Sequence, residues 1–187
     1  MYIKNATDTA REIIKNSVKP NDTVIDATAG NGNDTLLLAG LVGDEGMVYS
    51  FDIQKTAIDK TRELIDLNGL SERVTLINDG HENLLNYIDR EINYGIFNLG
   101  YLPGGDKSIK TKPETTIKAI NAMLSLLKKN GLMLIVVYHG KDSGEEEKKE
   151  LDKYIKGINQ KKYTILQMDY PNWKNKPPFL LIIEKIV

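Results

Sequence analysis

The sequence contains 187 residues with nearly balanced charge, 25 Lys and Arg against 26 Asp and Glu, and no cysteine. A hydrophobic fraction of 41% is typical of a globular chain, and the lack of cysteine excludes disulfide scaffolds, thiolate metal sites and cysteine nucleophiles. The balanced charge excludes the strong positive field of proteins that bind nucleic acid non-specifically, so any RNA contact must be local.

The sequence shows no targeting or membrane segment. Residues 1–17 mix charged and apolar side chains and lack the apolar core that a signal peptide needs. The longest apolar run, 132–138, is as long as a strand and far shorter than the roughly 18 residues of a membrane span. We therefore expect a cytoplasmic protein without a membrane role, folded as a single domain over residues 1–187.

The predicted elements alternate between helices and strands. Helices are indicated by apolar residues at helical spacing, such as Ala6, Ala10 and Ile13, and strands by short apolar runs between turn residues. In chain order we expect a leading helix within 1–18, a strand at 23–27, a helix at 35–41, a strand at 47–53, a helix at 55–68, a strand at 74–77, a short helix at 82–88, a strand at 94–99, a helix at 113–127, a strand at 132–138, a helix at 145–158 and strands at 163–168 and 179–186.

This alternation predicts an α/β fold. Strands joined through helices form right-handed crossovers, which build a mostly parallel sheet with helices on both faces. The last two strand segments, 163–168 and 179–186, have no helix between them, so we expect them to pair antiparallel in a seven-stranded sheet. The charge run 145–150 is interpreted as a solvated helix face.

A polar, glycine-containing loop follows the first predicted strand, where ligands bind in open α/β sheets. Its glycines let the backbone approach a ligand, and the next helix offers free N–H donors. Thr35 stands where a dinucleotide fingerprint has Gly or Ala, and Asp26 would repel phosphate but could hold an amino group. Both details favour a cofactor that carries an amino acid. The alternative is that the loop is a purely structural turn. The candidate cofactor residues of this loop are Asp26, Thr28, Gly30, Asn31, Gly32, Asn33 and Asp34.

Further acidic residues end the next two predicted strands. Asp52, with Gln54 beside it, ends the second strand, where a carboxylate can accept both hydroxyls of a ribose. Asp79 ends the third strand, where an adenine amino group could be recognised, and His81 is expected to shape that pocket. Carboxylates at three consecutive strand ends are hard to explain by packing alone.

This constellation resembles the class I S-adenosylmethionine-dependent methyltransferases over residues 23–186. In that family the loop matching 26–32 lines the methionine part of the cofactor, the acid matching Asp52 holds the ribose, and the acid matching Asp79 lies near the adenine. The resemblance implies a Rossmann-like methyltransferase fold with an antiparallel last strand and S-adenosylmethionine as cofactor. We expect no metal site.

Three segments resemble a narrower family, first labelled as rRNA methylases: 26–35, 98–107 and 138–140. Members of that family act on tRNA and methylate the amino group of 5-aminomethyluridine at the wobble position. The resemblance implies a tRNA N-methyltransferase. The alternatives are a methyltransferase of rRNA, of a small-molecule amine or of a protein side chain, and a cofactor-binding module without catalysis.

The segment 98–101 favours nitrogen as the methyl acceptor. Relatives that methylate amino groups carry Asn or Asp, two prolines and an aromatic residue at this strand end. Here Asn98 and the Leu99 carbonyl could accept the amine hydrogens, and the Tyr101 ring could stack on a base. Leu99 and Gly100 replace the two prolines, which makes the loop less rigid. The alternative is that Asn98 caps a turn and Tyr101 packs against the sheet.

The acceptor amine must lose a proton, because an alkylammonium has no lone pair and predominates at neutral pH. His139, at the end of a predicted strand, is a candidate proton acceptor or substrate-orienting residue, ahead of its neighbour Tyr138. The alternative for His139 is a hydrogen-bonded structural role.

Local basic residues could contact tRNA. The loop after the acceptor motif contains Lys107, Lys110 and Lys112, which suit phosphate contacts or else belong to a solvated surface loop. We also expect a homodimer, because so small a domain offers little separate surface for an RNA substrate. A second candidate strip comprises Lys141, Lys161, Lys162, Trp173, Lys174 and Lys176.

Overall fold

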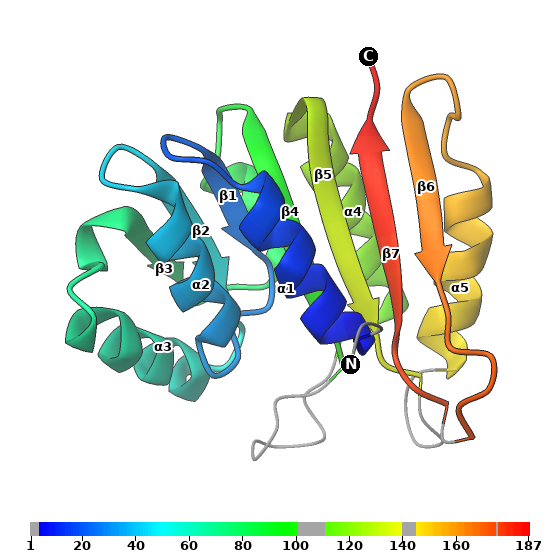
Figure 1. Cartoon of the computed structure of the whole chain (residues 1–187), viewed down its shortest axis with the longest axis horizontal. Helices are drawn as coiled ribbons and strands as arrows, with labels where there is room; N and C mark the ends of the chain where they lie inside the picture. Colours follow the sequence, from blue (N-terminus) through cyan, green and yellow to red (C-terminus); the bar gives the residue numbers. More distant parts are fainter. Residues whose placement is uncertain (1–3, 101–110, 140–144, 175) are drawn as a thin grey trace.

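The computed structural model describes residues 4–100, 111–139, 145–174 and 176–187, and its strands form one seven-stranded sheet (Figure 1). The strand order is β3-β2-β1-β4-β5-β7-β6. The elements are α1 (Ala6–Ser17), β1 (Thr23–Asp26), α2 (Asn33–Val42), β2 (Met47–Phe51), α3 (Lys55–Leu67), the 3-10 helix η1 (Ser71–Arg73), β3 (Val74–Ile77), the 3-10 helix η2 (His81–Asn86), β4 (Ile92–Leu99), α4 (Pro113–Leu126), β5 (Leu127–Val137), α5 (Glu145–Lys156), β6 (Tyr163–Met168) and β7 (Phe179–Lys185).

The strand directions confirm the predicted α/β class. β1 pairs in parallel with β2 and β4, and β3 and β5 continue the parallel arrangement on either side. β7 pairs antiparallel with both β5 and β6, so it is the strand that runs against the others. The carboxyl ends of β1 to β5 therefore lie along one edge of the sheet, which is the lower edge in Figure 1.

Helices cover both faces of the sheet. α1, α2 and α3 lie on the face toward the viewer in Figure 1, where Ile14, Leu38 and Ile65 pack with strand residues. α4 and α5 lie behind, where Met123 and Leu151 pack with the opposite side chains of the same strands. Burying both faces explains the nearly continuous apolar runs of the central strands.

The leading helix α1 is placed by its ends and by one apolar stripe. The Asn5 side chain caps it by accepting the N–H of Asp8 at 2.8 Å. Ala6, Ala10 and Ile14 are fully buried, at spacings that place them on one face. That face packs against β5 and β7, and the first turn of α1 lies near the carboxyl edge of the sheet (Figure 1).

Two expectations differ from the structure. β5 begins at Leu127, five residues before the expected start, because Leu127 pairs with Ile92 before an irregularity in the ladder. The charge run 145–150 is not wholly solvated: Glu147 is only 4% exposed, and its carboxylate accepts the hydroxyls of Thr111 at 2.8 Å and Thr116 at 2.7 Å. These bonds compensate the burial of a carboxylate and connect α5 to the start of α4.

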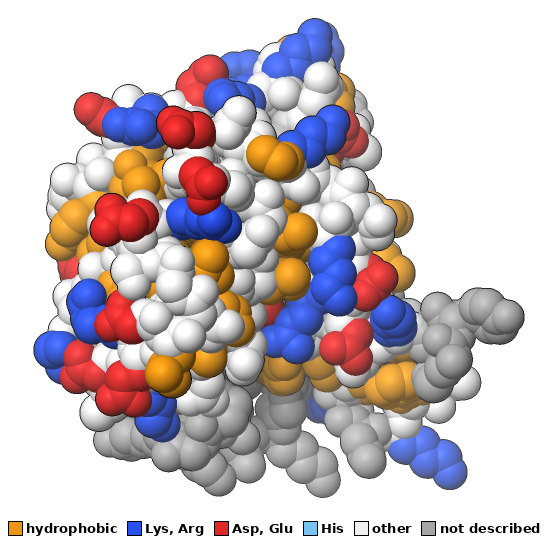
Figure 2. All heavy atoms as spheres, turned by 60° about the vertical axis from the view of Figure 1, so that its left-hand side comes forward, with side chains coloured by type: hydrophobic (Ala, Val, Ile, Leu, Met, Phe, Trp, Pro, Cys, Tyr) orange, Lys and Arg blue, Asp and Glu red, His pale blue; other side chains and the backbone are white. Residues whose placement is uncertain are grey.

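Charge is mixed over the face that Figure 2 shows, where Lys and Arg side chains alternate with Asp and Glu. This agrees with the balanced composition. Within the described residues, no helix combines the length and apolarity needed to cross a membrane.

Candidate active site

A cavity of about 680 Å³ lies at the carboxyl ends of β1 to β4. It straddles the point where β1 has β2 on one side and β4 on the other, which is where open α/β sheets bind ligands. Its volume is within the range of small-molecule sites. The predicted residues that line it are Thr28, Gly30, Asn31, Asn33, Asp34, Asp52, Gln54, Asp79, His81 and Asn98.

The loop after β1 turns sharply because of two glycines. Gly30 and Gly32 have φ values of 55° and 81°, in the left-handed region that favours glycine. A Cβ on Gly32 would lie 3.1 Å from the Cα of Thr61 in α3, so this glycine also permits close packing. Gly32 does not line the cavity, and its N–H donates to the carbonyl of Ala29. Gly32 was expected to contact the ligand, but in the structure it shapes the loop instead.

Asp26 also lies elsewhere than expected. Its side chain is fully buried and does not line the cavity. Its carboxylate accepts the backbone N–H of Thr28 at 3.1 Å and the hydroxyl of Thr35 at 2.6 Å, and the Thr35 oxygen in turn accepts the hydroxyl of Ser50 at 2.7 Å. Burial, and secondarily the nearby Asp34 carboxylate, raises the pKa of Asp26 to about 7. Because these bonds turn Asp26 inward, the carboxylate that this loop presents to the cavity is Asp34.

Asp52 lies in the cavity wall just after β2. One carboxylate oxygen accepts the N–H of Gly30 at 2.9 Å and the other accepts the N–H of Gln54 at 2.8 Å. Burial raises the pKa of Asp52 above its ordinary value, against the lowering effect of these two bonds. Each oxygen keeps a further lone pair. The carboxylate can therefore accept two neighbouring hydroxyl groups from a ligand.

Asp79 stands after β3 at the more exposed end of the cavity. Its Oδ1 accepts the N–H of Gly80 at 2.7 Å and the Asn83 amide at 3.0 Å, and its Oδ2 accepts the Tyr87 hydroxyl at 2.9 Å. The hydrogen bond from Asn83 is the main cause that lowers the pKa of Asp79. The carboxylate is therefore held in place and ionised at neutral pH.

His81 lines the same end of the cavity with one nitrogen already in use. Its Nδ1 lies 3.1 Å from the carbonyl oxygen of Ala27, and its ring packs edge-on against Phe97 at 5.6 Å. Burial lowers the pKa of His81, so the ring is neutral at neutral pH. A carbonyl can only accept, so Nδ1 carries the hydrogen and Nε2 is left as an acceptor.

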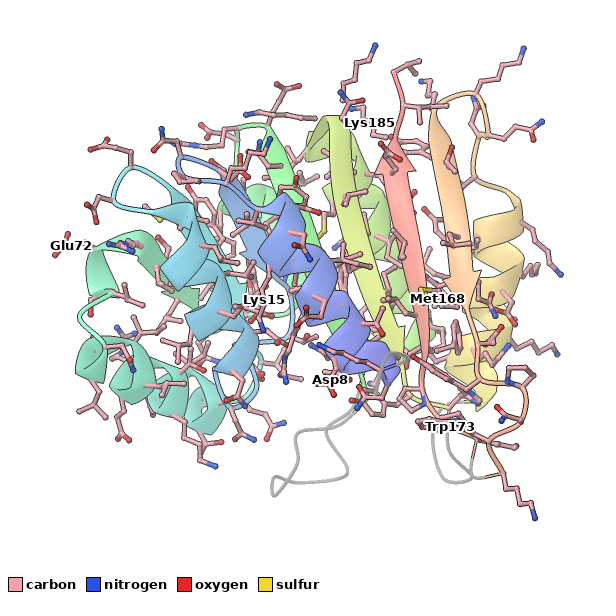
Figure 3. The ribbon with its side chains drawn as sticks, viewed as in Figure 1. Asp8, Lys15, Glu72, Met168, Trp173 and Lys185 are labelled. Atoms are coloured by element: carbon pink, nitrogen blue, oxygen red, sulfur yellow. The ribbon has the colours of Figure 1, made fainter. Side chains whose placement is uncertain are left out.

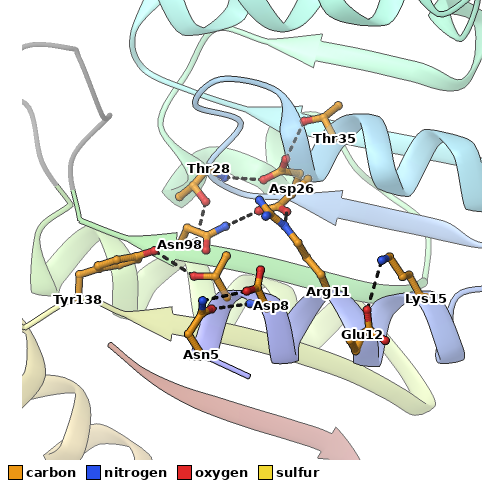
Figure 4. Close-up of polar contacts among 12 residues, drawn as sticks. Asn5, Asp8, Arg11, Glu12, Lys15, Asp26, Thr28, Thr35, Asn98 and Tyr138 are labelled. Atoms are coloured by element: carbon orange, nitrogen blue, oxygen red, sulfur yellow. Dashed lines mark hydrogen bonds and ion pairs between the residues drawn. The ribbon is translucent and has the colours of Figure 1, made fainter. Parts of the chain in front are cut away.

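Asn98, the penultimate residue of β4, has one half of its amide fixed. Its Nδ2 donates to Asp34 at 2.7 Å, and its backbone N–H donates to the Thr28 hydroxyl at 2.8 Å (Figure 4). Its buried Oδ1 has no hydrogen-bond partner among the described residues. A buried amide oxygen without a partner is costly, which marks this atom as a candidate for a ligand contact.

Two residues of α1 that no sequence motif singled out, Thr7 and Arg11, also line the cavity. Arg11 Nε contacts Asp34 Oδ1 at 2.6 Å in an ion pair whose carboxylate side chain is only 8% exposed. The hydroxyls of Thr7 and Tyr138 lie 3.0 Å apart (Figure 4). Thr7 and Arg11 stand four residues apart, so helical spacing does put them on a common face. Nothing in the sequence indicates that this face closes the cavity.

The remaining acceptor-site candidates have different positions. His139 does not line this cavity: its ring packs against Phe179 at 5.4 Å, and it borders a separate groove beside α5. Tyr138, the weaker candidate, does line the cavity. The Leu99 carbonyl accepts the N–H of Tyr138 at 3.2 Å, which leaves it one lone pair. Tyr101 lies outside the described residues.

The basic-loop candidates are only partly described. Lys112 lines the cavity at the start of α4, whereas Lys107 and Lys110 lie outside the described residues. Lys161 and Lys162 precede β6 at the edge opposite the cavity, so they do not form one strip with Trp173, which Figure 3 shows at the cavity edge.

Comparisons with known proteins agree on one family. The family model described as "Putative rRNA methylase" matches residues 48–184. The tRNA (mnm(5)s(2)U34)-methyltransferase, chloroplastic, of Arabidopsis thaliana is 41% identical in an alignment of 165 residues that covers 83% of this chain. The chain spans 60% of the length of that relative.

Two solved structures match over nearly their whole length. A "putative rRNA-methylase" from Clostridium thermocellum is 48% identical with a TM-score of 0.97, and the match covers 100% of both chains. A "putative methyltransferase" from Streptococcus mutans, in complex with SAH, is 37% identical with a TM-score of 0.90, over 98% of this chain and 99% of the other. The protein therefore has the Rossmann-like methyltransferase fold and belongs to the family described as "Putative rRNA methylase".

Proposed function

We propose that the protein is an S-adenosylmethionine-dependent methyltransferase that methylates an amine nitrogen of tRNA, the aminomethyl group of 5-aminomethyluridine at the wobble position. The observation that carries this proposal is the buried Oδ1 of Asn98 at the cavity, which has no hydrogen-bond partner among the described residues. Two relatives support it: the Arabidopsis protein is named for a tRNA methyltransferase acting at U34, and the Streptococcus protein binds SAH.

The cavity suits the proposed cofactor because its acceptors match the donors of that molecule. Asp52 would hold the two ribose hydroxyls, and His81 Nε2 or Asp79 would accept from the adenine amino group. The loop from Thr28 to Asp34 would line the methionine part. S-adenosylmethionine would supply there a methyl group already activated by the positive sulfur. The chain's own task is then to bind the acceptor as a neutral amine and to align it.

Asn98 would align the acceptor amine. Its Oδ1 can accept one amine hydrogen and so direct the nitrogen lone pair. Asp34 fixes which end of the amide is presented, since a reversed amide would place its oxygen against the carboxylate. Arg11 holds Asp34 from the other side. These three residues form a chain that keeps the acceptor oxygen in place.

The same ion pair favours the neutral amine that methylation needs. Arg11 compensates the charge of Asp34, so the carboxylate beside Asn98 attracts an ammonium less than a lone carboxylate would. Since His139 lies outside the cavity, the proton-accepting role predicted for it finds no support in its position. We propose instead that the site selects the neutral amine and that the released proton reaches solvent past the half-exposed Tyr138.

The direct test is methyl transfer from labelled S-adenosylmethionine to tRNA carrying unmethylated 5-aminomethyluridine, with identification of the product nucleoside by mass spectrometry. We expect label in the wobble nucleoside and none in rRNA or in free alkylamines. Transfer only to rRNA, to an amine or to a protein would contradict the tRNA assignment. Binding of SAH without turnover on any of these substrates would support the non-catalytic module. The homodimer and the cytoplasmic location stay predictions.

A further inference from the structure

A second, shallower hollow lies beside the cavity, between the end of β5 and α5. We call it the α5 groove. Among the described residues that line it, all but one carry a basic or imidazole side chain: His139, Lys148, Lys149, Asp152, Lys153, Lys156 and Lys176.

The positive charge of the α5 groove follows from how α5 is oriented. Lys149, Lys153 and Lys156 recur at helical spacing and are all exposed. Three acidic residues of α5 have described side chains: Asp152 pairs with Lys148 inside the groove at 2.6 Å, the buried Glu147 accepts two threonine hydroxyls, and Glu150 lines a different hollow. A chain with a net charge of −1 therefore presents a local cluster of cations beside its cavity.

The α5 groove and the cavity both reach the end of β5. Tyr138 lines the cavity and the next residue, His139, lines the groove. A positively charged groove of this kind can track the backbone of a nucleic-acid strand.

We infer that the α5 groove binds phosphates of the RNA strand whose modified base enters the cavity; this inference rests on the proposed function. Lysines act on phosphate as point charges and carry no sequence information, so the groove would position the strand while the cavity selects the base. A partner of this kind explains why the lysines of α5 gather on the side that faces His139.

The test compares two triple variants of the full chain that each remove three lysines. The groove variant removes three exposed lysines of α5 by Lys149→Ala, Lys153→Ala and Lys156→Ala. The control variant removes three exposed lysines at the opposite edge of the sheet by Lys129→Ala, Lys161→Ala and Lys162→Ala. We expect the groove variant to bind substrate tRNA at least about tenfold more weakly, with the slope of log affinity against log salt smaller by about 2. The control variant should change little, and SAH affinity should be unchanged in both.

Three results would overturn the inference. Unchanged tRNA affinity and salt slope in the groove variant, while the wild-type protein still methylates tRNA, would exclude the groove and leave the proposed function standing. An equal loss in both triple variants would show a general charge effect with no contribution from the groove. If the wild-type protein neither binds nor methylates tRNA, the proposed function fails first. Should the alanine variant lose SAH binding through misfolding, the Lys→Gln triple at the same positions gives the same readouts.

Discussion

The two ends of the cavity are built differently. At the end with Asp52 and Asp79, several hydrogen bonds join residues within four positions of each other, such as Gln54 to Asp52 and Asn83 to Asp79. At the end with Asn98, the bonds join residues 64 positions apart, from Asn98 to Asp34, and 23 apart, from Arg11 to Asp34. The hydrogen bonds at the Asp52 and Asp79 end form within turns at the strand ends. Those at the Asn98 end form because α1 and β4 pack around one loop.

This difference indicates that one end of the cavity binds the cofactor and the other aligns the acceptor. The carboxylates at the first end are satisfied by neighbouring groups before any ligand arrives, so their spare lone pairs contribute affinity. The second end keeps an unpartnered oxygen in place through an ion pair, which is preorganisation of the kind that acts on rate. Substitutions at the two ends should therefore change different kinetic quantities.

The largest effect is expected for Asn98→Ala. Loss of the aligning oxygen should lower the single-turnover rate constant of methyl transfer by about a hundredfold or more, while SAH affinity measured by calorimetry stays nearly unchanged. Raising the pH should not restore the rate, because the defect is in alignment and not in protonation. Asn16→Ala, at an exposed position of α1, is the matched control. A wild-type rate in Asn98→Ala would remove the main support for nitrogen as the acceptor.

Asp52→Ala should weaken SAH binding by about tenfold to a hundredfold, since charge-assisted hydrogen bonds of roughly 1.5–3 kcal/mol are lost. The rate at saturating cofactor should change less, which is the reverse of the Asn98 result. Calorimetric titration measures the affinity, and Asp89→Ala at an exposed site serves as control. Unaltered affinity would mean that the ribose binds elsewhere.

The buried Asp26 should make stability depend on pH. Its pKa is raised from the ordinary 3.8 to about 7, so the folded state holds a proton that the unfolded state releases. This contribution is fully present below pH 3.8 and is lost as pH rises through about 7. Between about pH 5 and 8, the free energy of unfolding measured with urea should fall by about 2 kcal/mol more in the wild type than in Asp26→Asn. Parallel pH profiles would show that Asp26 is ionised throughout.

The smallest effect is expected for Arg11→Ala, because Asp34 keeps its bond to Asn98. The transfer rate should fall by about tenfold with little change in SAH affinity. Removal of the cation leaves the Asp34 charge uncompensated, which favours the ammonium, so the rise of rate with pH should move to higher pH. Lys15→Ala, one turn further along α1, should leave both quantities unchanged. A lowered rate with an unmoved pH profile would contradict the proposed selection of the neutral amine.

The sequence by itself determined the sheet and the edge at which the site forms. Helical and strand periodicities are local, so the alternating elements and the antiparallel β7 followed from neighbouring residues alone. Parallel strands end at a common edge, which is why Asp52, Asp79 and Asn98 meet in one cavity although they are distant in sequence.

Only the tertiary structure decided which strand-end side chains face the cavity. Asp26 turned inward because the hydroxyl of Thr35 on α2 meets it there, and His139 faces the α5 groove beside Phe179. Arg11 reached the site because the buried stripe of α1 packs on β5 and β7, a contact that residues more than a hundred positions away provide. Side-chain direction at a strand end depends on what packs over it, and that packing is set by burial across the whole fold and not by local sequence.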